Sequence, residues 1–364
     1  MTVLGFLGLA QFEAQHLPTF RGNQTRNTLK MNGTGSTNFD YCHFFPHSNP
    51  VVTCFSPNPE TIHLATLHTE KPTLVIHEIQ NPDAFSETTT NADTIEAKIT
   101  YAVALPEVSE ALCWAGPELL FVGGRTELRA IKLREEGVQD VIALAPFEKG
   151  VGVTKVAFRD ADIACVGSKG QIALVNIDGY AKQDIGRETS EITGLQWKGA
   201  HELVTSSSAG RITLYDIRED GPGRQLTDQH NPSLSINCLD VHPVLHDKIA
   251  TGDTTGLVGV WDLRKMDEAA VETLRMHNGQ DVWGVKFHPD SPGEIVSCGE
   301  DGSICLARWS PDGIDANSIT NDRADVLRYQ SRRHPLPFNS IDIHAGVNLL
   351  AGVGDGGALV LQQL

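Results

Sequence analysis

The chain has 364 residues, with 46 acidic against 29 basic side chains and a formal net charge of −17. A field of that sign repels phosphate backbones before contact, so we expect no direct binding of nucleic acid. No apolar run approaches the ~20 residues that cross a bilayer, so we expect no insertion into a membrane. Because the acidic residues are scattered, they indicate a charged surface that favours basic segments of partner proteins.

Seven cysteines form an odd set without paired spacing, which predicts reduced, buried thiols in an intracellular protein. The first ten residues, MTVLGFLGLA, have the apolar character of a signal peptide core. However, no positive charge precedes them, and the first basic residue is Arg21. We therefore interpret residues 1–10 as a β-strand.

A turn position followed by a short alternating strand recurs seven times, at intervals of 40 to 54 residues. The turn positions are Pro72, Thr126, Gly170, Gly210, Gly256, Gly302 and Gly356. Length alone suggests two domains, but units of about 45 residues cannot bury their apolar faces singly, whereas a closed ring of sheets can. The sequence predicts an all-β fold, a single seven-bladed β-propeller over residues 1–364.

In chain order, residues 11–38 are predicted to be irregular, and the leading strand of the first blade is either 39–45 or 51–55. Residues 81–100 and 311–337 interrupt the period and are predicted to be long loops. Later blades have clear alternating first strands. These are VTKVAF (153–158), ITGLQW (192–197), INCLDV (236–241), VWGVKF (282–287) and FNSIDI (338–343).

The last predicted strand, residues 358–364, leaves the seventh sheet one strand short of four. We predict that residues 1–10 supply the missing strand. Pairing an N-terminal strand with the last blade removes an exposed edge and ties the ends of the ring together.

The sequence gives little support for a catalytic or ligand-binding site. The segment GVGDGG (352–357) matches GxGxxG, but a strand rather than a helix follows, so we interpret it as a hairpin. The set Cys42, His43, His47 and Cys54 matches no standard zinc spacing and is better explained by packing. No nucleophile elbow or paired metal-binding histidines are present. We expect no cofactor, no metal and no enzyme activity.

One set of positions favours protein binding. In register with Trp283, the second residues of the other first strands lie near the entrance of the central channel. The candidates for partner binding are Glu110, Thr154, Thr193, Asn237, Trp283 and Asn339. Trp283 is either an interface anchor or a capped core aromatic, because an amphipathic indole suits both.

Fragments of the later repeats resemble the WD-repeat family: YDIR (215–218), VWDLR (260–264), CLDVHP (238–243), VKFHP (285–289) and GEDGSI (299–304). The first repeat departs from that pattern, with His77 and Glu78 in place of tryptophan and aspartate. The resemblance implies a seven-bladed propeller that binds proteins, without catalysis.

Within that family, residues 235–304 and the ending 337–361 are similar to the WD-repeat nucleoporins of the Y-shaped scaffold in the outer ring of the nuclear pore. This resemblance implies a subunit that is monomeric within a hetero-oligomer and attached to an elongated helical nucleoporin. It further implies a nuclear envelope location, support of RNA and protein transport, and visits to kinetochores in mitosis.

A second resemblance stays open. YDIR and WDLR on consecutive blades resemble the paired WDxR boxes of substrate receptors for cullin-4 ubiquitin ligases, which implies that Arg218 and Arg264 project from the bottom face to an adaptor propeller. Alternatively, each arginine pairs with a local carboxylate, Asp216 or Asp262. A third possibility is another WD-repeat interaction protein.

Overall fold

The computed structural model describes residues 41–45, 49–58, 61–80, 95–134, 137–219, 221, 223–227, 234–265, 272–308, 327–330 and 336–364. The chain divides into two units, Met1–Gly35 and Ser36–Leu364, and all described residues belong to the second. The architecture below is that of this second unit.

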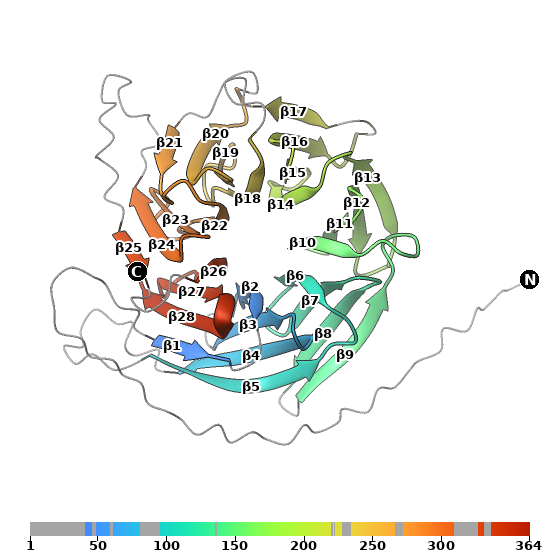
Figure 1. The fold of residues 1–364 in the computed structure, drawn as a ribbon. Coiled ribbons are helices and arrows are strands. Elements are labelled where there is room, and N and C mark those ends of the chain that lie inside the picture. The colour runs from blue at the N-terminus through green and yellow to red at the C-terminus, as the bar shows by residue number, and fades with distance from the viewer. Residues whose placement is uncertain are drawn as a thin grey trace, which may run out of the picture. The chain divides into compact units, whose positions relative to one another are not determined.

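The second unit contains seven four-stranded antiparallel sheets, or blades, arranged around a common axis (Figure 1). Blade one contains β2 (Pro50–Phe55), β3 (Ile62–His68), β4 (Thr73–Gln80) and β5 (Glu96–Ala104). Blade two contains β6 (Ser109–Trp114), β7 (Leu119–Gly124), β8 (Leu128–Arg134) and β9 (Gly137–Leu144). Blade three contains β10 (Val153–Arg159), β11 (Asp162–Gly167), β12 (Gln171–Asn176) and β13 (Lys182–Arg187).

Blades four to seven repeat the pattern. Blade four contains β14 (Ile192–Lys198), β15 (Glu202–Ser207), β16 (Arg211–Asp216) and β17 (Arg224–Thr227). Blade five contains β18 (Ile236–Val241), β19 (Lys248–Asp253), β20 (Leu257–Asp262) and β21 (Glu272–Arg275). Blade six contains β22 (Val282–Phe287), β23 (Glu294–Gly299), β24 (Ser303–Arg308) and β25 (Leu327–Gln330). Blade seven contains β26 (Phe338–His344), β27 (Leu349–Gly354) and β28 (Ala358–Gln363), and its fourth strand is β1 (Tyr41–Phe44). The seven-bladed prediction is confirmed.

The turn between the second and third strand of a blade depends on glycine. Gly256 has a φ of 83°, in the left-handed region that favours glycine. A Cβ atom at this position would overlap the carbonyl oxygen of His277, so the site also excludes a side chain by space. The segment 352–357 likewise forms a hairpin turn, through a three-residue 3-10 turn at Asp355–Gly357, and β28 follows it.

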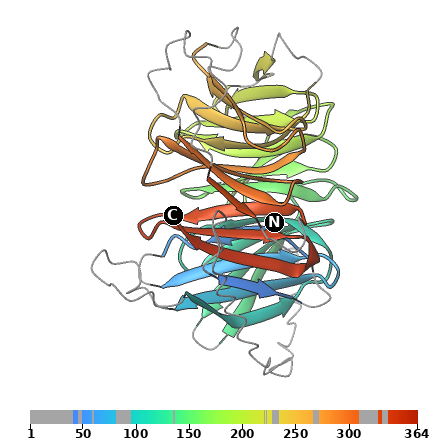
Figure 2. The same cartoon turned by 60° about the vertical axis from the view of Figure 1, so that its left-hand side comes forward.

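The ring is closed by β1, which pairs antiparallel with β28, Tyr41 opposite Leu361 and Phe44 opposite Ala358 (Figures 1 and 2). The prediction that an N-terminal strand completes the last blade is confirmed. Its placement at residues 1–10 needs correction, because β1 occupies that position, and residues 1–10 lie outside the described residues. The physical reason is proximity: blades seven and one are neighbours, so a short connection from Phe45 to Asn49 leads directly into β2.

This assignment also resolves the two alternatives for the leading strand of blade one. β2 (Pro50–Phe55) is that strand, and the other candidate segment, 39–45, contains the closing strand. Both segments have strand character, and pairing partners distant in sequence decide between them.

Two predicted loops contain strands. The last residues of 81–100 belong to β5, and β25 lies within 311–337. Both are outermost strands with one neighbour only, so their sequences carry a weaker alternating pattern than the inner strands. Residues 81–94, 311–326 and 331–335 lie outside the described residues, as do residues 11–38.

The hydrophobic core lies between neighbouring blades. One cluster joins Val258 and Val260 of blade five to Val285 and Phe287 of blade six, all nearly inaccessible to solvent. Each blade therefore buries its apolar faces against its neighbours, as the repeat length predicted.

A charged cluster ties inner strands together near the axis. Lys286 Nζ lies 3.6 Å from Asp240 Oδ1 and 3.6 Å from Asp342 Oδ1. Burial lowers the pKa of Lys286, but the two carboxylates outweigh it, so the net pKa lies above its ordinary value. The ammonium group stays charged and links blades five, six and seven.

Candidate functional site

Every inner strand has a β-bulge at its second residue. The pairing register with the next strand shifts there in all seven blades. The bulged residues are Val51, Glu110, Thr154, Thr193, Asn237, Trp283 and Asn339. A bulge redirects its side chain away from the regular strand alternation. We call this end of the ring the bulge face.

The six candidates for partner binding therefore occupy equivalent positions, on the bulge face. The seventh member, Val51, was not predicted, because the leading strand of blade one was left between two segments. A β-bulge cannot be recognised from the sequence of one strand. The six candidates were found because the repeats, once aligned, place them at the same strand position.

Several of these side chains hold the ring together. Thr193 Oγ1 donates to the carbonyl of Ile236 in the next blade at 2.7 Å. Asn339 Nδ2 donates to Pro50 O of blade one at 3.3 Å and to Asp355 Oδ1 at 2.9 Å. These bonds join blade four to five and blade seven to one, so the two residues have a structural role.

Trp283 and Glu110 are the exposed members of the set. The Trp283 side chain is 39% exposed, and its Nε1 donates to Glu300 Oε2 at 2.8 Å. The hydrogen bond fixes the indole ring while leaving part of it open to a partner. The indole is capped but exposed, so the alternative of a core aromatic is wrong, and the interface anchor stays a prediction.

Carboxylates surround Trp283. Burial, followed by the negative charges of Glu300 and Asp253, raises the pKa of Asp281. Burial is the first cause of this shift, and the carboxylates of Glu300 and Asp253 add to it by repulsion. A positively charged group from a partner would relieve that repulsion.

Arg218 and Arg264 lie at the opposite end of the ring. Arg218 Nε bonds Asp216 Oδ1 at 2.9 Å, and Arg264 Nε bonds Asp262 Oδ1 at 2.9 Å. In both pairs Nη2 also bonds the second carboxylate oxygen, at 2.5 and 2.6 Å. The side chains of the two arginines remain 63% and 65% exposed. The local pairing predicted as the alternative to adaptor binding is present.

We call this opposite end, where hairpins join the first and second strands of each blade, the hairpin face. The backbone amide of Leu263 bonds the carbonyl of Asp247 in the β18–β19 hairpin at 2.8 Å. Asp262 is buried and also contacts Lys248 Nζ at 3.2 Å. The Asp262 carboxylate therefore binds two cations, Lys248 and Arg264.

The cysteines whose side chains the structure describes form no disulfide with one another and are at least partly buried. Burial raises the pKa of Cys165 and of Cys238 to about 12, so both thiols stay protonated. Of the set Cys42, His43, His47 and Cys54, only the Cys54 side chain is described. Across the described residues, no group of three or more potential ligands could hold a metal ion.

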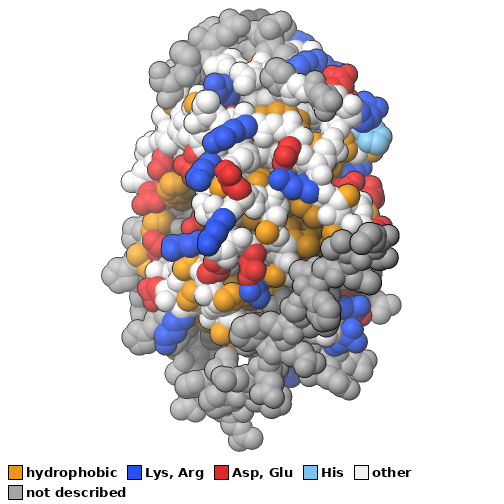
Figure 3. Space-filling model, turned by 90° about the vertical axis from the view of Figure 1, so that its right-hand side faces the viewer, with side chains coloured by type: hydrophobic (Ala, Val, Ile, Leu, Met, Phe, Trp, Pro, Cys, Tyr) orange, Lys and Arg blue, Asp and Glu red, His pale blue; other side chains and the backbone are white. Residues whose placement is uncertain are grey.

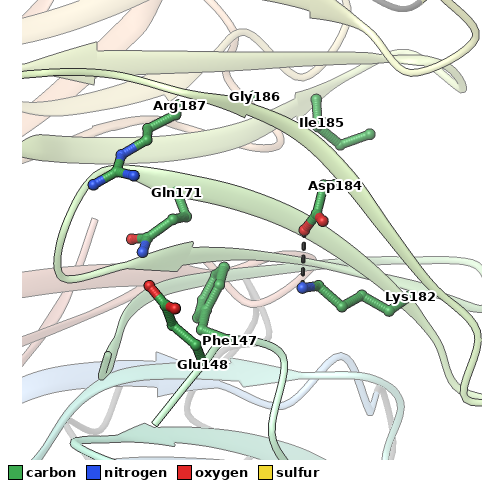
Figure 4. A pocket seen from close by; sticks show the side chains of 8 residues that line it. All are labelled: Phe147, Glu148, Gln171, Lys182, Asp184, Ile185, Gly186 and Arg187. Carbon is green, nitrogen blue, oxygen red and sulfur yellow. Dashed lines mark ion pairs between the residues drawn. The ribbon is translucent and has the colours of Figure 1, made fainter. Parts of the chain in front are cut away.

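A shallow hollow of about 530 Å³ lies beside β13 on blade three, and no sequence pattern indicated it. Lys182 Nζ is 2.9 Å from Asp184 and 5.9 Å from the centre of the Phe147 ring, while Arg187 lies across the hollow (Figure 4). On this side of the ring, cations and carboxylates are interspersed over apolar groups (Figure 3). The hollow therefore presents both signs of charge and no array of catalytic groups.

Within the described segments, no helix is long and apolar enough to span a bilayer. A family profile described as "WD domain, G-beta repeat" matches residues 269–310, from the outer strand of blade five through the third strand of blade six.

Comparison with other proteins identifies nucleoporins. Nucleoporin Nup43 of Mus musculus is 27% identical over 207 residues, 56% of this chain and 52% of that protein. Nuclear pore complex protein nup43 of Dictyostelium discoideum is 23% identical over 217 residues, 54% of this chain and 49% of that protein. Protein transport protein SEC31 of Coccidioides immitis is 31% identical over 159 residues, 41% of this chain but 12% of that protein.

The chain spans about half the length of the Nup43 proteins that it matches. The residues that match the WD-repeat profile include four consecutive strands, β21 to β24, which make up one full period of the repeat. The chain is a seven-bladed β-propeller that contains a match to the WD-repeat profile and is similar, over about half its length, to nucleoporins of the nuclear pore.

Proposed function

We propose that the chain is a non-enzymatic scaffold subunit of the nuclear pore, within its Y-shaped complex. The similarity to nucleoporins of an animal and of an amoeba carries this proposal. The similarity to SEC31, a protein transport protein, covers a much smaller share of that protein. The proposal extends to attachment to a helical nucleoporin, to support of RNA and protein transport, and to kinetochores in mitosis.

In this proposal the propeller acts as a rigid support for its partners. Hydrogen bonds between blades fix the ring, such as those of Thr193 and Asn339, so a partner meets preformed loops and little conformational entropy is lost on the propeller side. We propose that the bulge face makes one contact, with Glu110, Thr154, Thr193, Asn237, Trp283 and Asn339 around it. Trp283 supplies the aromatic anchor, and the carboxylates of Asp281 and Glu300 favour a basic partner segment.

Purification of the tagged full chain from nuclei tests the proposal. Helical nucleoporins should co-purify in stoichiometric amounts, and the tagged chain should form a rim at the nuclear envelope in microscopy. Trp283→Ala should weaken the complex, whereas Tyr180→Ala, which changes an exposed aromatic on another blade, should not. Stable purification without any nucleoporin would overturn the scaffold role.

The exposed pairs on the hairpin face favour one second candidate, a substrate receptor of a cullin-4 ligase. Arg218 and Arg264 are both open to solvent and held by local carboxylates. Arg218→Ala with Arg264→Ala tests it. Loss of a bound adaptor propeller would favour the ligase role, and unchanged partners would exclude it.

A further inference from the structure

The hairpin between β18 and β19 on the hairpin face carries two exposed aliphatic side chains. Val244 is 63% exposed and Leu245 is 41% exposed. Among the described residues, these are the only large exposed apolar side chains that are neighbours in sequence. We call this pair the blade-five knob. Contiguous exposed apolar surface bordered by polar side chains is a feature of contact sites between proteins.

The knob is held rigidly by His242. The Nδ1 atom of His242 accepts the backbone N–H groups of Val244 at 3.1 Å and of Leu245 at 2.8 Å. Because Nδ1 accepts, the proton of the neutral ring lies on Nε2, which is 3.0 Å from the carbonyl of Pro292 in blade six and donates to it. Leu245 is further fixed by its carbonyl, which accepts the Lys248 amide at 2.7 Å.

Blade six shows that this turn does not require apolar residues. There His288 Nδ1 accepts the backbone N–H groups of Asp290 at 3.2 Å and of Ser291 at 3.0 Å. Asp290 and Ser291 occupy the positions of Val244 and Leu245 in the equivalent hairpin. The same backbone therefore carries two polar side chains on one blade and two aliphatic side chains on the next, so turn geometry does not explain the knob.

Charges beside the knob indicate the kind of partner. The Asp247 carboxylate on the same hairpin lies 3.0 Å from Lys198 Nζ and 3.9 Å from Arg264 Nε. Arg264 is 65% exposed and bonds Asp262 through Nε and Nη2, so its Nη1 offers N–H donors to another carboxylate. Asp247, two residues after Leu245 on the same hairpin, thus connects the knob to the exposed guanidinium of Arg264.

We propose that the blade-five knob docks an amphipathic helix of a partner protein. Two apolar side chains of that helix, three or four residues apart, contact Val244 and Leu245, and an acidic side chain one turn further pairs with Arg264. The hairpin face lies at the opposite end of the inner strands from Trp283, so the ring contacts two partner segments at once. The identity of the partner rests on the proposed scaffold function, but the chemistry of the contact does not.

Photo-crosslinking in the full chain tests the contact. Leu245→benzoylphenylalanine should crosslink to a helical segment with an apolar stripe and acidic flank, as mapped by mass spectrometry. The matched control is Ile99→benzoylphenylalanine, whose native side chain is 45% exposed on β5 of another blade, and it should not label that segment. Crosslinks from Leu245 to a second copy of this chain, or to no protein beyond the Ile99 control, would overturn the proposal.

The affinity of the crosslinked segment, made as a peptide, is then measured by titration. The double variant Val244→Asp with Leu245→Ser gives blade five the residues of blade six and should fold with an unchanged melting temperature. It should bind the peptide at least tenfold more weakly, while Val244→Ile should bind normally. Equal binding by the folded double variant would contradict the proposal. An acidic amphipathic helix that binds the knob but belongs to a protein outside the nuclear pore would contradict the proposed scaffold function. That result would still support the contact at the knob.

Discussion

Asp342 of the last blade accepts a hydrogen bond from the backbone amide of Phe55 in the first blade, with Oδ2 and N 2.7 Å apart. Asp240 makes the same bond to the amide of Phe287, from blade five to blade six, at 2.9 Å. Both carboxylates also neutralise Lys286. One charged cluster therefore links the inner strands on both sides of the ring closure.

Asp342→Ala should lower the free energy of unfolding by about 2–3 kcal/mol, because it leaves the Phe55 amide without its acceptor and Lys286 with one carboxylate. Asp342→Asn should cost less, since the amide oxygen still accepts from Phe55. Urea unfolding followed by circular dichroism measures both. As a control, Asp178→Ala in an exposed turn should change stability by less than ~0.5 kcal/mol. Equal effects of Asp342→Ala and Asp178→Ala would show that the bond across the closure contributes nothing.

Truncation tests the closing strand. Removal of residues 1–35, which end at the boundary between the two units, should leave the melting temperature of the ring unchanged. Removal of residues 1–45 deletes β1 and exposes the edge of β28, so the melting temperature should fall by about 5 °C or more and aggregation should increase. A large loss of stability already on removal of residues 1–35 would contradict the assignment of β1.

The buried carboxylate of Glu188, in the connection from blade three to blade four, accepts hydrogen bonds from Thr205 Oγ1 at 2.9 Å and from the Tyr215 hydroxyl at 3.3 Å. Burial first, and then the charge of Glu188, raises the pKa of Tyr215. Tyr215→Phe removes one of these donors and should lower the free energy of unfolding by about 1–2 kcal/mol. Thermal unfolding should show this loss, whereas Tyr180→Phe, at a 53% exposed position, should be neutral. Identical melting temperatures for the two variants would contradict the role of the hydroxyl.

Three buried histidines predict a loss of stability in acid. Burial lowers the pKa of His242 and of His288, and lowers that of His68 to about 4. The unfolded chain therefore binds protons more tightly than the folded chain. The stabilisation is complete above the unfolded value of about 6.5 and is lost as the pH falls toward the folded values.

Urea midpoints measured from pH 7.5 to 4.5 should accordingly decrease below pH 6.5. Replacement of His68 by glutamine, which does not titrate, should flatten part of that decrease, because burial lowers the pKa of His68 further than that of His242 or His288. A midpoint that rises or stays constant as the pH falls from 6.5 would be inconsistent with neutral buried histidines.

The strands nearest the axis were predictable from sequence, because their alternation of buried apolar residues with less buried residues is a local pattern. The pattern VTKVAF at 153–158 became β10 (Val153–Arg159) almost without change. Glycine at the turn before the third strand of blades three to seven was an equally local signal, since Gly170, Gly210, Gly256, Gly302 and Gly356 all have positive φ. Local pairing of Arg218 with Asp216 was also predictable from a separation of two residues.

Long-range choices were not predictable. Residues 1–10 and 41–44 both have strand character, and only the pairing of Tyr41 with Leu361, about 320 positions along the chain, identifies the closing strand. The outer strands β5 and β25 touch one neighbour each, so their sequences resemble loops. The blade-five knob gave no signal either, because an apolar pair in a turn of an alternating sequence is ordinarily assigned to the core.

Closure through β1 and β28 has a consequence for synthesis. β1 emerges from the ribosome before any blade, yet its partner is among the last strands to be made. Until then, β1 and the face of blade one that packs on blade seven remain uncovered, in a state that chaperones and proteases recognise. A chain interrupted before residue 358 cannot pair β1 with β28, so its ring stays open and the edge of β1 stays exposed.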